Sequence, residues 1–355
     1  MVNNQNTILQ VENLHTHFFT ESGIIRALRG VDFSVERGKV LGIVGESGCG
    51  KSVTAQCIMN MLPSNGRVVE GKITYYRQDP AINQIEAIDI NSLPPRGRAM
   101  RAIRGNESAM IFQEPMTSLD PVYTTGSQLM EAITLHQNVT KQEGKEIAID
   151  ALAKVNLPEP ARIFDAYPHQ LSGGQRQRVM IAIALSCNPT LLIADEPTTA
   201  LDVTTQAQIL DLMRALQEET HMSIIFITHD LGVVAEMCDD VAVMYLGKAV
   251  ERTDVDTTFH NPQHPYTRAL LRSIPRLDAE NQYRLDVIKG RVPDPSVVPS
   301  GCPFHPRCPE MVPGLCEVYT PEVISIGDNH QVRCLLHDDK LMAQATTPTA
   351  FAESR

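Results

Sequence analysis

The apolar side chains near the start of the chain are distributed as in β-strands. Residues 7–19 are rich in β-branched and aromatic side chains, and a similar run at residues 24–35 follows a turn signal at residues 21–23. The pattern predicts two antiparallel strands joined by a short turn.

Farther along, short apolar runs alternate with stretches of helical periodicity. The runs, which suit buried parallel strands, cover residues 39–44, 191–194 and 223–228. The helical stretches cover residues 51–62, 175–185 and 204–219. Strands that alternate with helices predict an α/β domain with a parallel core sheet.

The composition changes near residue 261. Before it, the largely polar residues 82–104 predict an inserted surface element, and residues 241–251 predict a hairpin that turns at Gly247. After it, proline, histidine and arginine become frequent and the periodicity fades. We predict a large domain over residues 1–260, a small irregular domain over residues 261–340 and a flexible tail over residues 341–355.

The overall composition restricts the class of protein. Of the 355 residues, 43% are hydrophobic and 21% are charged, which excludes a largely disordered chain. The 31 basic and 42 acidic residues give a net charge of −11, so we expect no nucleic acid partner. No apolar run reaches the roughly 18 residues of a membrane span, and residues 1–11 lack the features of a secretory signal. We expect a cytosolic chain that meets a membrane through a partner.

A glycine-rich motif follows the first short apolar run. Residues 45–52 read GESGCGKS and fit the phosphate-loop pattern G-x-x-x-x-G-K-S/T, between a predicted strand and a predicted helix. Backbone N–H groups of such a loop point at phosphate oxygens, and the start of the helix adds a favourable dipole. Lys51 is placed to reach the β- and γ-phosphates, and Ser52 to bind Mg²⁺. The motif predicts binding of a nucleoside triphosphate, because a chance glycine-rich turn would not need the flanking strand and helix.

Two carboxylates end the apolar run at residues 191–194. Asp195 and Glu196 follow it directly, and neighbouring side chains on a strand point in opposite directions. We predict that Asp195 faces Mg²⁺ and that Glu196 faces the attacking water. An apolar run that ends in two acids is also a common structural pattern, and the phosphate loop upstream is what favours the functional interpretation.

A glycine pair begins a helix between these two motifs. Residues 171–175 read LSGGQ, in which Ser172 is a typical N-cap and Gly173 and Gly174 expose the first amides of the helix. The arrangement predicts a second anion site. An ordinary capped helix would need neither the glycine pair nor Gln175.

Together these motifs resemble the ATP-binding subunit of ABC transporters, over residues 8–254. The resemblance implies the P-loop NTPase fold of an ABC cassette, with a parallel core sheet, an antiparallel β subdomain and a helical subdomain. It also implies ATPase activity in a pair of subunits that hold two ATP molecules between them. The residues implied to contact ATP held by the opposite subunit are Ser172, Gly173, Gly174, Gln175 and Asp202.

The resemblance also implies a catalytic set and a Mg²⁺ site. Gln113, within residues 111–115, matches a glutamine that contacts Mg²⁺ and senses the membrane subunits, and His229 matches a histidine that reaches the γ-phosphate. With Glu196 they form the implied catalytic set. The implied Mg²⁺ ligands are Ser52, Gln113 and Asp195.

The adenine and the phosphates of ATP have their own implied contacts. On the first strand, we expect Phe18 rather than Phe19 to stack on the base. The residues implied to bind ATP within the same chain are Phe18, Gly45, Glu46, Ser47, Gly48, Cys49, Gly50, Lys51, Ser52 and Val53.

Two segments indicate the cargo. Residues 264–271 with Pro275, and residues 110–121, are similar to those of dipeptide and oligopeptide importer ATPases. The resemblance implies peptide import powered from the cytoplasmic face of the membrane. The implied partners are two permease subunits, a second ATPase chain and an extracytoplasmic substrate-binding protein. Importers of nickel and other small solutes share the C-terminal segment and are the alternative.

ABC ATPases of DNA repair and of the ribosome form a different class. The repair type has a long coiled coil inside the cassette, and the ribosomal type has two cassettes in one chain. This sequence has neither feature, and its acidic charge also disfavours both.

Four of the eight cysteines fall within the C-terminal part, with the spacing Cys302-x5-Cys308-x7-Cys316-x17-Cys334. Four thiolates can hold zinc or an iron–sulfur cluster, and the paired C-x-x-C knuckles that are usual for zinc are absent. The similarity to peptide importers implies a 4Fe–4S cluster, with Zn²⁺ or free thiols as alternatives.

Overall fold

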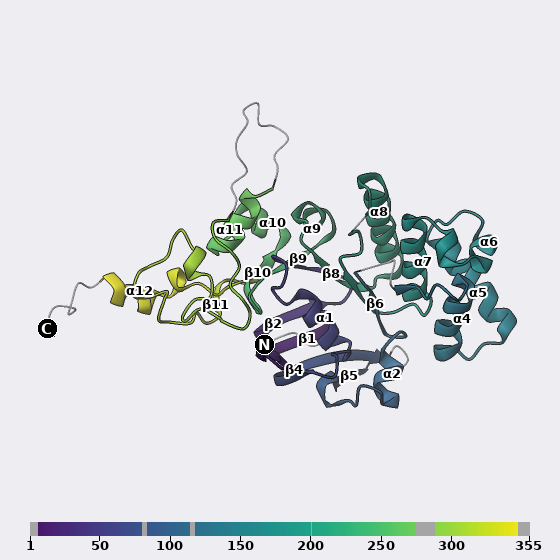
Figure 1. Cartoon of the computed structure of the whole chain (residues 1–355), viewed down its shortest axis with the longest axis horizontal. Coiled ribbons are helices and arrows are strands. Elements are labelled where there is room, and N and C mark those ends of the chain that lie inside the picture. Colours follow the sequence, from purple (N-terminus) through teal and green to yellow (C-terminus); the bar gives the residue numbers. More distant parts are fainter. Residues whose placement is uncertain (1–5, 80–83, 114–117, 200, 275–287, 347–355) are drawn as a thin grey trace, which may run out of the picture.

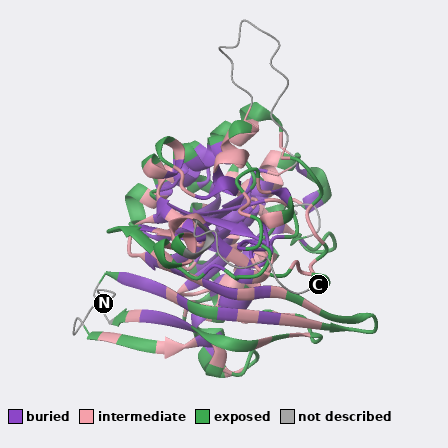
Figure 2. Ribbon diagram, turned by 90° about the vertical axis from the view of Figure 1, so that its left-hand side faces the viewer, coloured by how far each residue is buried: buried purple, intermediate pink, exposed green. Residues whose placement is uncertain are grey.

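The structure, a computed structural model, describes residues 6–79, 84–113, 118–199, 201–274 and 288–346. A central sheet lies between a helical part formed by α4 to α7 at one end and the C-terminal region at the other (Figure 1). An antiparallel sheet lies beside the central sheet and forms a separate layer (Figure 2). Buried residues are concentrated in the central sheet and the elements around it, and further buried positions lie along the antiparallel strands.

The central sheet has eight strands among the described residues, in the order β11-β12-β10-β9-β3-β8-β7-β6. Their bounds are β3 (Val40–Val44), β6 (Ser108–Ile111), β7 (Leu191–Asp195), β8 (Ser223–Thr228), β9 (Asp240–Tyr245), β10 (Lys248–Asp254), β11 (Ile324–Gly327) and β12 (His330–Val332). Strands β6, β7, β8, β3 and β9 pair in parallel. Every residue of β3, β7, β8 and β9 is buried, as in parallel strands covered on both faces. The predicted parallel core sheet is confirmed.

The antiparallel sheet has the strand order β2-β1-β4-β5. Its strands are β1 (Thr7–Thr20), β2 (Gly23–Glu36), β4 (Gly66–Asp79) and β5 (Gln84–Asp89). The turn between β1 and β2 lies where the sequence predicts it. Part of the predicted polar insertion instead forms β5 on the edge of β4, and the helix α2 after it buries Met100 and Ile103.

The helices are α1 (Lys51–Ile58), α2 (Arg98–Ile103), α4 (Thr125–His136), α5 (Lys141–Lys154), α6 (Pro160–Asp165), α7 (Gly173–Leu185), α8 (Val203–Thr220), α9 (Leu231–Met237), α10 (Val255–His260), α11 (Pro265–Arg272) and α12 (Asp339–Thr346). Short 3-10 turns cover Ile90–Ser92, Pro168–Gln170, His305–Arg307 and Leu335–His337. The helix α1 ends four residues before the predicted residue 62. Asn60 has a φ of 50°, a left-handed conformation that ends a helix.

The C-terminal region joins the core sheet. Strand β12 pairs antiparallel with β10, with Val332 opposite Glu251, and β11 pairs with β12. Residues 261–340 therefore contribute two strands where the sequence predicts only irregular structure. The boundary of a separate domain near residue 261 stays a prediction.

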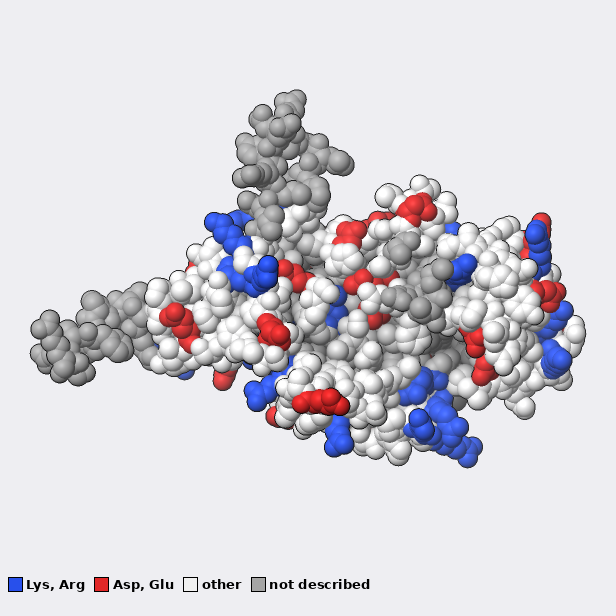
Figure 3. Space-filling model, in the orientation of Figure 1, with Lys and Arg blue, Asp and Glu red and all other residues white. Residues whose placement is uncertain are grey.

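Two features of the molecule concern contact with a membrane: the length and apolar character of its helices, and the charged side chains on its surface. None of the helices in the described part of the chain combines the length and the apolar character that a membrane span requires. On the face drawn in Figure 3, small groups of basic side chains alternate with small groups of acidic ones.

Candidate nucleotide-binding and catalytic site

The phosphate loop connects the buried strand β3 to the helix α1. At Gly45, a Cβ atom would lie 2.2 Å from the Met244 carbonyl oxygen, so only glycine fits there. Gly50 caps α1 with a φ of 106°, and a Cβ atom there would lie 2.7 Å from Leu28. These two glycines allow the loop to curl tightly beneath a phosphate group.

Two side chains at the start of α1 face the loop and the end of β7. The buried Lys51 ammonium donates hydrogen bonds to the carbonyl oxygens of Gly45 (2.8 Å) and Glu46 (3.3 Å). The Ser52 hydroxyl donates to Asp195 Oδ1 at 3.1 Å. Strands β3 and β7 both pair in parallel with β8, which lies between them, so the phosphate loop and the carboxyl end of β7 lie at the same edge of the sheet and form one site.

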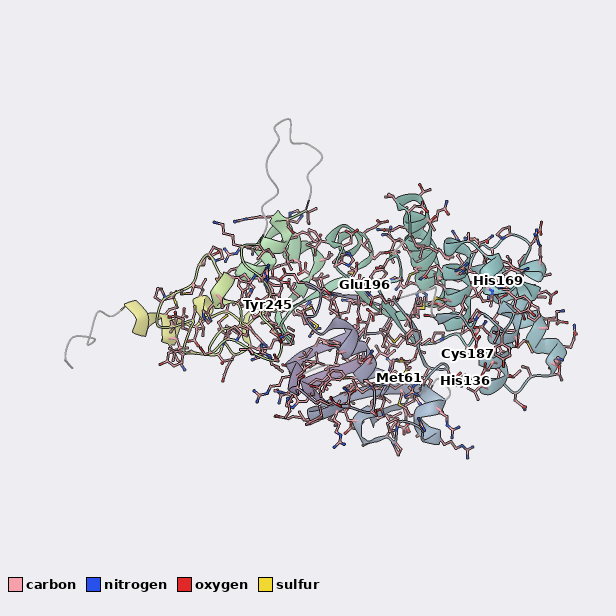
Figure 4. All side chains as sticks on the ribbon, in the orientation of Figure 1. Met61, His136, His169, Cys187, Glu196 and Tyr245 are labelled. Carbon is pink, nitrogen blue, oxygen red and sulfur yellow. The ribbon has the colours of Figure 1, made fainter. Side chains whose placement is uncertain are left out.

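Glu196 is the centre of a polar cluster at this edge of the sheet, near the middle of the molecule (Figure 4). Thr199 Oγ1 donates to Glu196 Oε2 at 2.8 Å, and Gln113 Nε2 donates to the same oxygen at 3.2 Å. His229 Nδ1 lies 3.4 Å from Glu196 Oε1. Burial alone would raise the pKa of Glu196, but the Thr199 hydroxyl and His229 outweigh it and hold the pKa below its ordinary value. The carboxylate is thus kept charged, as a base or a water-positioning group must be.

A cavity of about 300 Å³ opens beside these groups. Its lining residues are Phe18, Ile25, Ala27, Ser47, Gly48, Gly50, Lys51, Ser52, Val53, Gln113, Glu196 and Pro295. Phe18 is in the lining, whereas Phe19 is 43% exposed and lies under the guanidinium group of Arg67. The cavity brings together a candidate base-stacking residue, the phosphate loop and the catalytic carboxylate.

The LSGGQ residues do not line this cavity. Ser172 caps α7 with a capping box, in which its hydroxyl accepts from the Gln175 N–H (3.3 Å) and Gln175 Oε1 accepts from the Ser172 N–H (3.0 Å). A Cβ atom on Gly173 would meet no atom within 4 Å, so the start of α7 is open to a ligand or another chain. Asp202 is exposed and caps α8 by accepting from the Thr205 N–H at 3.0 Å.

The comparisons with known proteins agree with this geometry. The family described as "ABC transporter" matches residues 28–199, and the family described as "Oligopeptide/dipeptide transporter, C-terminal region" matches residues 250–316. The Oligopeptide transport ATP-binding protein AppD of Bacillus subtilis is 48% identical over 335 residues, which are 94% of this chain and 98% of AppD. The chain belongs to the ABC transporter family. Like other ATP-binding subunits of that family, it hydrolyses ATP to drive transport through membrane permease partners.

Two further similarities concern this ABC subunit. The Dipeptide transport ATP-binding protein DppD of Escherichia coli is 46% identical over 327 residues, covering 92% of this chain and 96% of DppD. A solved dimeric ATP-binding cassette, in a post-hydrolysis state with ADP and Pi, aligns with a TM-score of 0.59 and 27% identity, over 70% of this chain and 99% of the other. The predicted ABC cassette fold is confirmed.

The four C-terminal cysteines of the ABC subunit require a correction. Within the described residues, which include all four, no group of three or more His, Cys, Asp or Glu side chains is arranged to hold a metal ion. All four are free cysteines in the structure. The prediction of a 4Fe–4S cluster at Cys302, Cys308, Cys316 and Cys334 was therefore wrong, as was the zinc alternative.

Sequence reasoning did not predict the contacts that three residues make at the site. Thr199, which holds the Glu196 carboxylate by a hydrogen bond, lies three residues after it. This short spacing is the only feature of the sequence that points to the contact. Tyr266 and Arg307 contact the phosphate loop from more than two hundred residues beyond it. Tyr266 lies within residues 264–271, which indicated the cargo and not a contact with the loop, and no sequence pattern marks Arg307. Residues 114–117 and Pro275, which belong to the segments quoted for the family, lie outside the described residues.

The ABC subunit also has oxygen ligands suited to Mg²⁺. The Ser52 hydroxyl and the Asp195 carboxylate lie 3.1 Å apart, and Mg²⁺ prefers such oxygens together with water and substrate phosphates. Gln113 joins the same cluster through Glu196. These residues therefore fit the ion that ABC ATPases use with ATP.

Asp195 should reduce the stability of the nucleotide-free protein. Burial raises the pKa of its carboxyl group, which the Ser52 hydrogen bond only partly opposes. Because the folded protein holds this proton more tightly than the unfolded chain, the charged carboxylate costs stability at pH values above both pKa values, and the cost disappears as the pH falls. We expect Asp195→Asn to raise the Tm at about pH 7.5 by about 2 °C or more, and the gain to shrink toward about pH 4.

The control for this measurement is Asp150→Asn, because Asp150 is exposed and forms an i,i+4 pair with Lys154 on α5. Its Tm should stay within about 1 °C of the wild type. Thermal scans without nucleotide test both variants. An Asp195→Asn protein that melts at or below the wild-type temperature at pH 7.5 would contradict the inference that the charged Asp195 carboxylate costs stability.

Proposed function

We propose that this chain is the ATP-hydrolysing subunit that powers the import of dipeptides and oligopeptides. The observation that carries the proposal is the combination of a complete nucleotide site with a C-terminal region of the oligopeptide/dipeptide type. Relatives named for oligopeptide and dipeptide transport, which match more than nine-tenths of the chain, support it.

In this proposal the residues divide the reaction between them. The phosphate loop and Lys51 bind the phosphates, and Phe18 stacks on the adenine. Ser52, Asp195 and Gln113 would hold Mg²⁺, which would neutralise phosphate charge. Glu196, which Thr199 and His229 hold in place, positions and deprotonates the attacking water. His229 also contacts the γ-phosphate.

The open start of α7 supports a role in trans. Ser172, Gly173, Gly174, Gln175 and Asp202 lie outside the lining of the chain's own cavity. In the proposed assembly they contact ATP bound to a second ATPase subunit, so each nucleotide is enclosed by two chains. Hydrolysis then reopens the pair.

A change at Gly173 tests this arrangement. Gly173 is the first helical residue of α7 and has free space around it, so Gly173→Asp should leave the fold intact, and an acid at a helix start is stabilising. In the assembled transporter, however, the new carboxylate would face the phosphates of the partner's ATP, and we expect ATP hydrolysis to fall about tenfold or more. ADP binding by the separate chain should not change.

Lys141→Asp is the matched control for Gly173→Asp, because it places the same acid at the first residue of α5 in the same helical part. Its transporter should keep wild-type ATPase activity. If Gly173→Asp also kept that activity in the assembled transporter, the role of α7 in trans would be refuted.

The proposed partners are two permease subunits, a second ATPase chain and an extracytoplasmic substrate-binding protein, with this chain on the cytoplasmic face of the membrane. The test is reconstitution of the complete complex in proteoliposomes and measurement of ATP-dependent uptake of labelled di- to pentapeptides and of labelled Ni²⁺. Peptide uptake that the Glu196→Gln variant abolishes would support the proposal. Uptake of Ni²⁺ but not of peptides would replace it with the small-solute alternative.

A further inference from the structure

A buried arginine from the C-terminal region is paired with the phosphate loop. Arg307 Nη1 lies 2.7 Å from Glu46 Oε2, and Arg307 Nη2 lies 3.0 Å from Glu46 Oε1. The pair is bidentate, the geometry in which arginine binds a carboxylate most strongly. The Arg307 side chain is 3% exposed and the Glu46 side chain 26%, so solvent screens this pair less than a pair on the surface.

A second residue of the C-terminal region holds the backbone of the same loop residue. The Glu46 N–H donates to Tyr266 Oη at 3.0 Å, and Tyr266 is completely buried. Both ends of Glu46, its amide and its carboxylate, are therefore fixed by residues that follow the cassette in the sequence. Few conformations of the loop can satisfy both contacts.

The two contacting side chains are themselves held firmly. Tyr266 packs against Tyr245 and Phe304, with ring centroids 4.7 and 5.3 Å away, and Figure 4 marks the position of Tyr245 at the C-terminal side of the sheet. The Arg307 guanidinium lies 5.8 Å from the centroid of the Tyr245 ring and donates through Nε to the carbonyl oxygen of Lys289 at 3.2 Å. The contacts on Glu46 thus come from a rigid cluster.

The position of Glu46 gives these contacts a consequence for nucleotide binding. Glu46 lies inside the loop, and its carbonyl oxygen accepts from the Lys51 ammonium that is to meet the phosphates. A free carboxylate at this place would repel the phosphates and compete for Lys51. Arg307 neutralises that carboxylate and turns it toward the C-terminal region.

We propose that Arg307 and Tyr266 are positioning residues of the nucleotide site, which keep Glu46 and the phosphate loop in the arrangement that binds phosphate. The C-terminal region therefore contributes to ATP affinity, in addition to any part it takes in transport. Pro295, from the same region, lies in the lining of the nucleotide cavity. The inference rests on the ATP site of the proposed function and not on its peptide cargo.

The experiment measures ADP binding to the full-length chain with Mg²⁺ by isothermal titration calorimetry. We expect Arg307→Met, which keeps the length of the side chain but not its charge, to raise the ADP dissociation constant about tenfold or more. Glu46→Gln added to Arg307→Met removes the uncompensated charge, so the double variant should return to within about threefold of the wild type. A purely structural role of Arg307 would not give this rescue.

The control is Arg268→Met, because Arg268 pairs with Glu310 and donates to the carbonyl oxygen of Gln263, both outside the phosphate loop. It should leave ADP affinity within about twofold of the wild type. Tyr266→Phe removes only the hydroxyl that accepts from the Glu46 N–H, and it should weaken ADP binding about threefold or more. This variant replaces Arg307→Met as the test if Arg307→Met does not fold.

Three results would overturn the inference: wild-type affinity in folded Arg307→Met, no recovery in the double variant, or, where Arg307→Met does not fold, wild-type affinity in Tyr266→Phe. A wild-type chain that binds no ADP would instead refute the ATP site itself. The two failures are therefore distinguishable.

Discussion

Replacing Glu196 with glutamine should lower the rate of ATP hydrolysis by about a hundredfold or more, while ADP binding stays unchanged. Glutamine has the size of glutamate and can still accept the hydrogen bond from Thr199, so the cluster with Gln113 and His229 should keep its shape. What is lost is the negative charge, which the structure maintains by holding the pKa of Glu196 below its ordinary value. An amide cannot take a proton from the attacking water.

The measurement compares ATPase activity of the reconstituted transporter with ADP binding by the separate chain. Glu86→Gln provides the control, because Glu86 is an exposed partner of Arg77 on the antiparallel sheet. That variant should behave as the wild type in both assays. Near-normal hydrolysis by Glu196→Gln would remove Glu196 from the catalytic role.

The second large effect is expected at Lys51. In the structure its ammonium donates to two backbone carbonyls, and bound nucleotide would offer it phosphate oxygens in their place. Lys51→Met keeps most of the apolar stem of this buried side chain but removes the charge. We expect the dissociation constant for ADP with Mg²⁺ to rise by about ten- to a hundredfold, because the loss of a hydrogen bond to a charged group usually weakens binding by that factor.

Lys154→Met is the matched change for Lys51→Met, at a lysine that is exposed and paired with Asp150. It should alter neither ADP affinity nor Tm. Isothermal titration and thermal scans distinguish loss of the ligand contact from loss of the fold. Unchanged affinity in a folded Lys51→Met protein would show that the phosphate loop binds nucleotide without this side chain.

The sequence predicts the nucleotide site well because its parts follow local rules. Residues 45–52 need only a strand before them and a helix after them, and the apolar run at residues 191–194 identifies a buried parallel strand. The carboxyl ends of parallel strands meet at one edge of a sheet, so the two motifs come together in space. Ser52 and Asp195 accordingly form a hydrogen bond.

The C-terminal region could not be predicted in the same way. Its strands β11 and β12 are short, and they depend on the distant edge of β10. The contact between Arg307 and Glu46 joins residues 261 positions apart, beyond the reach of any periodicity. For the cysteines, the failure has another cause: spacing alone cannot fix where four sulfur atoms lie or whether they ionise.

The pairing of β12 with β10 has a consequence for how the protein can be divided. Ending the chain at residue 260 would remove β12 and leave the backbone N–H and C=O groups of β10 that face it unpaired. Such an unpaired strand edge can pair with other chains. It would also release Glu46 from both of its contacts. Measurements on a chain trimmed at residue 260 would therefore reflect an exposed strand edge and a less constrained phosphate loop at the same time.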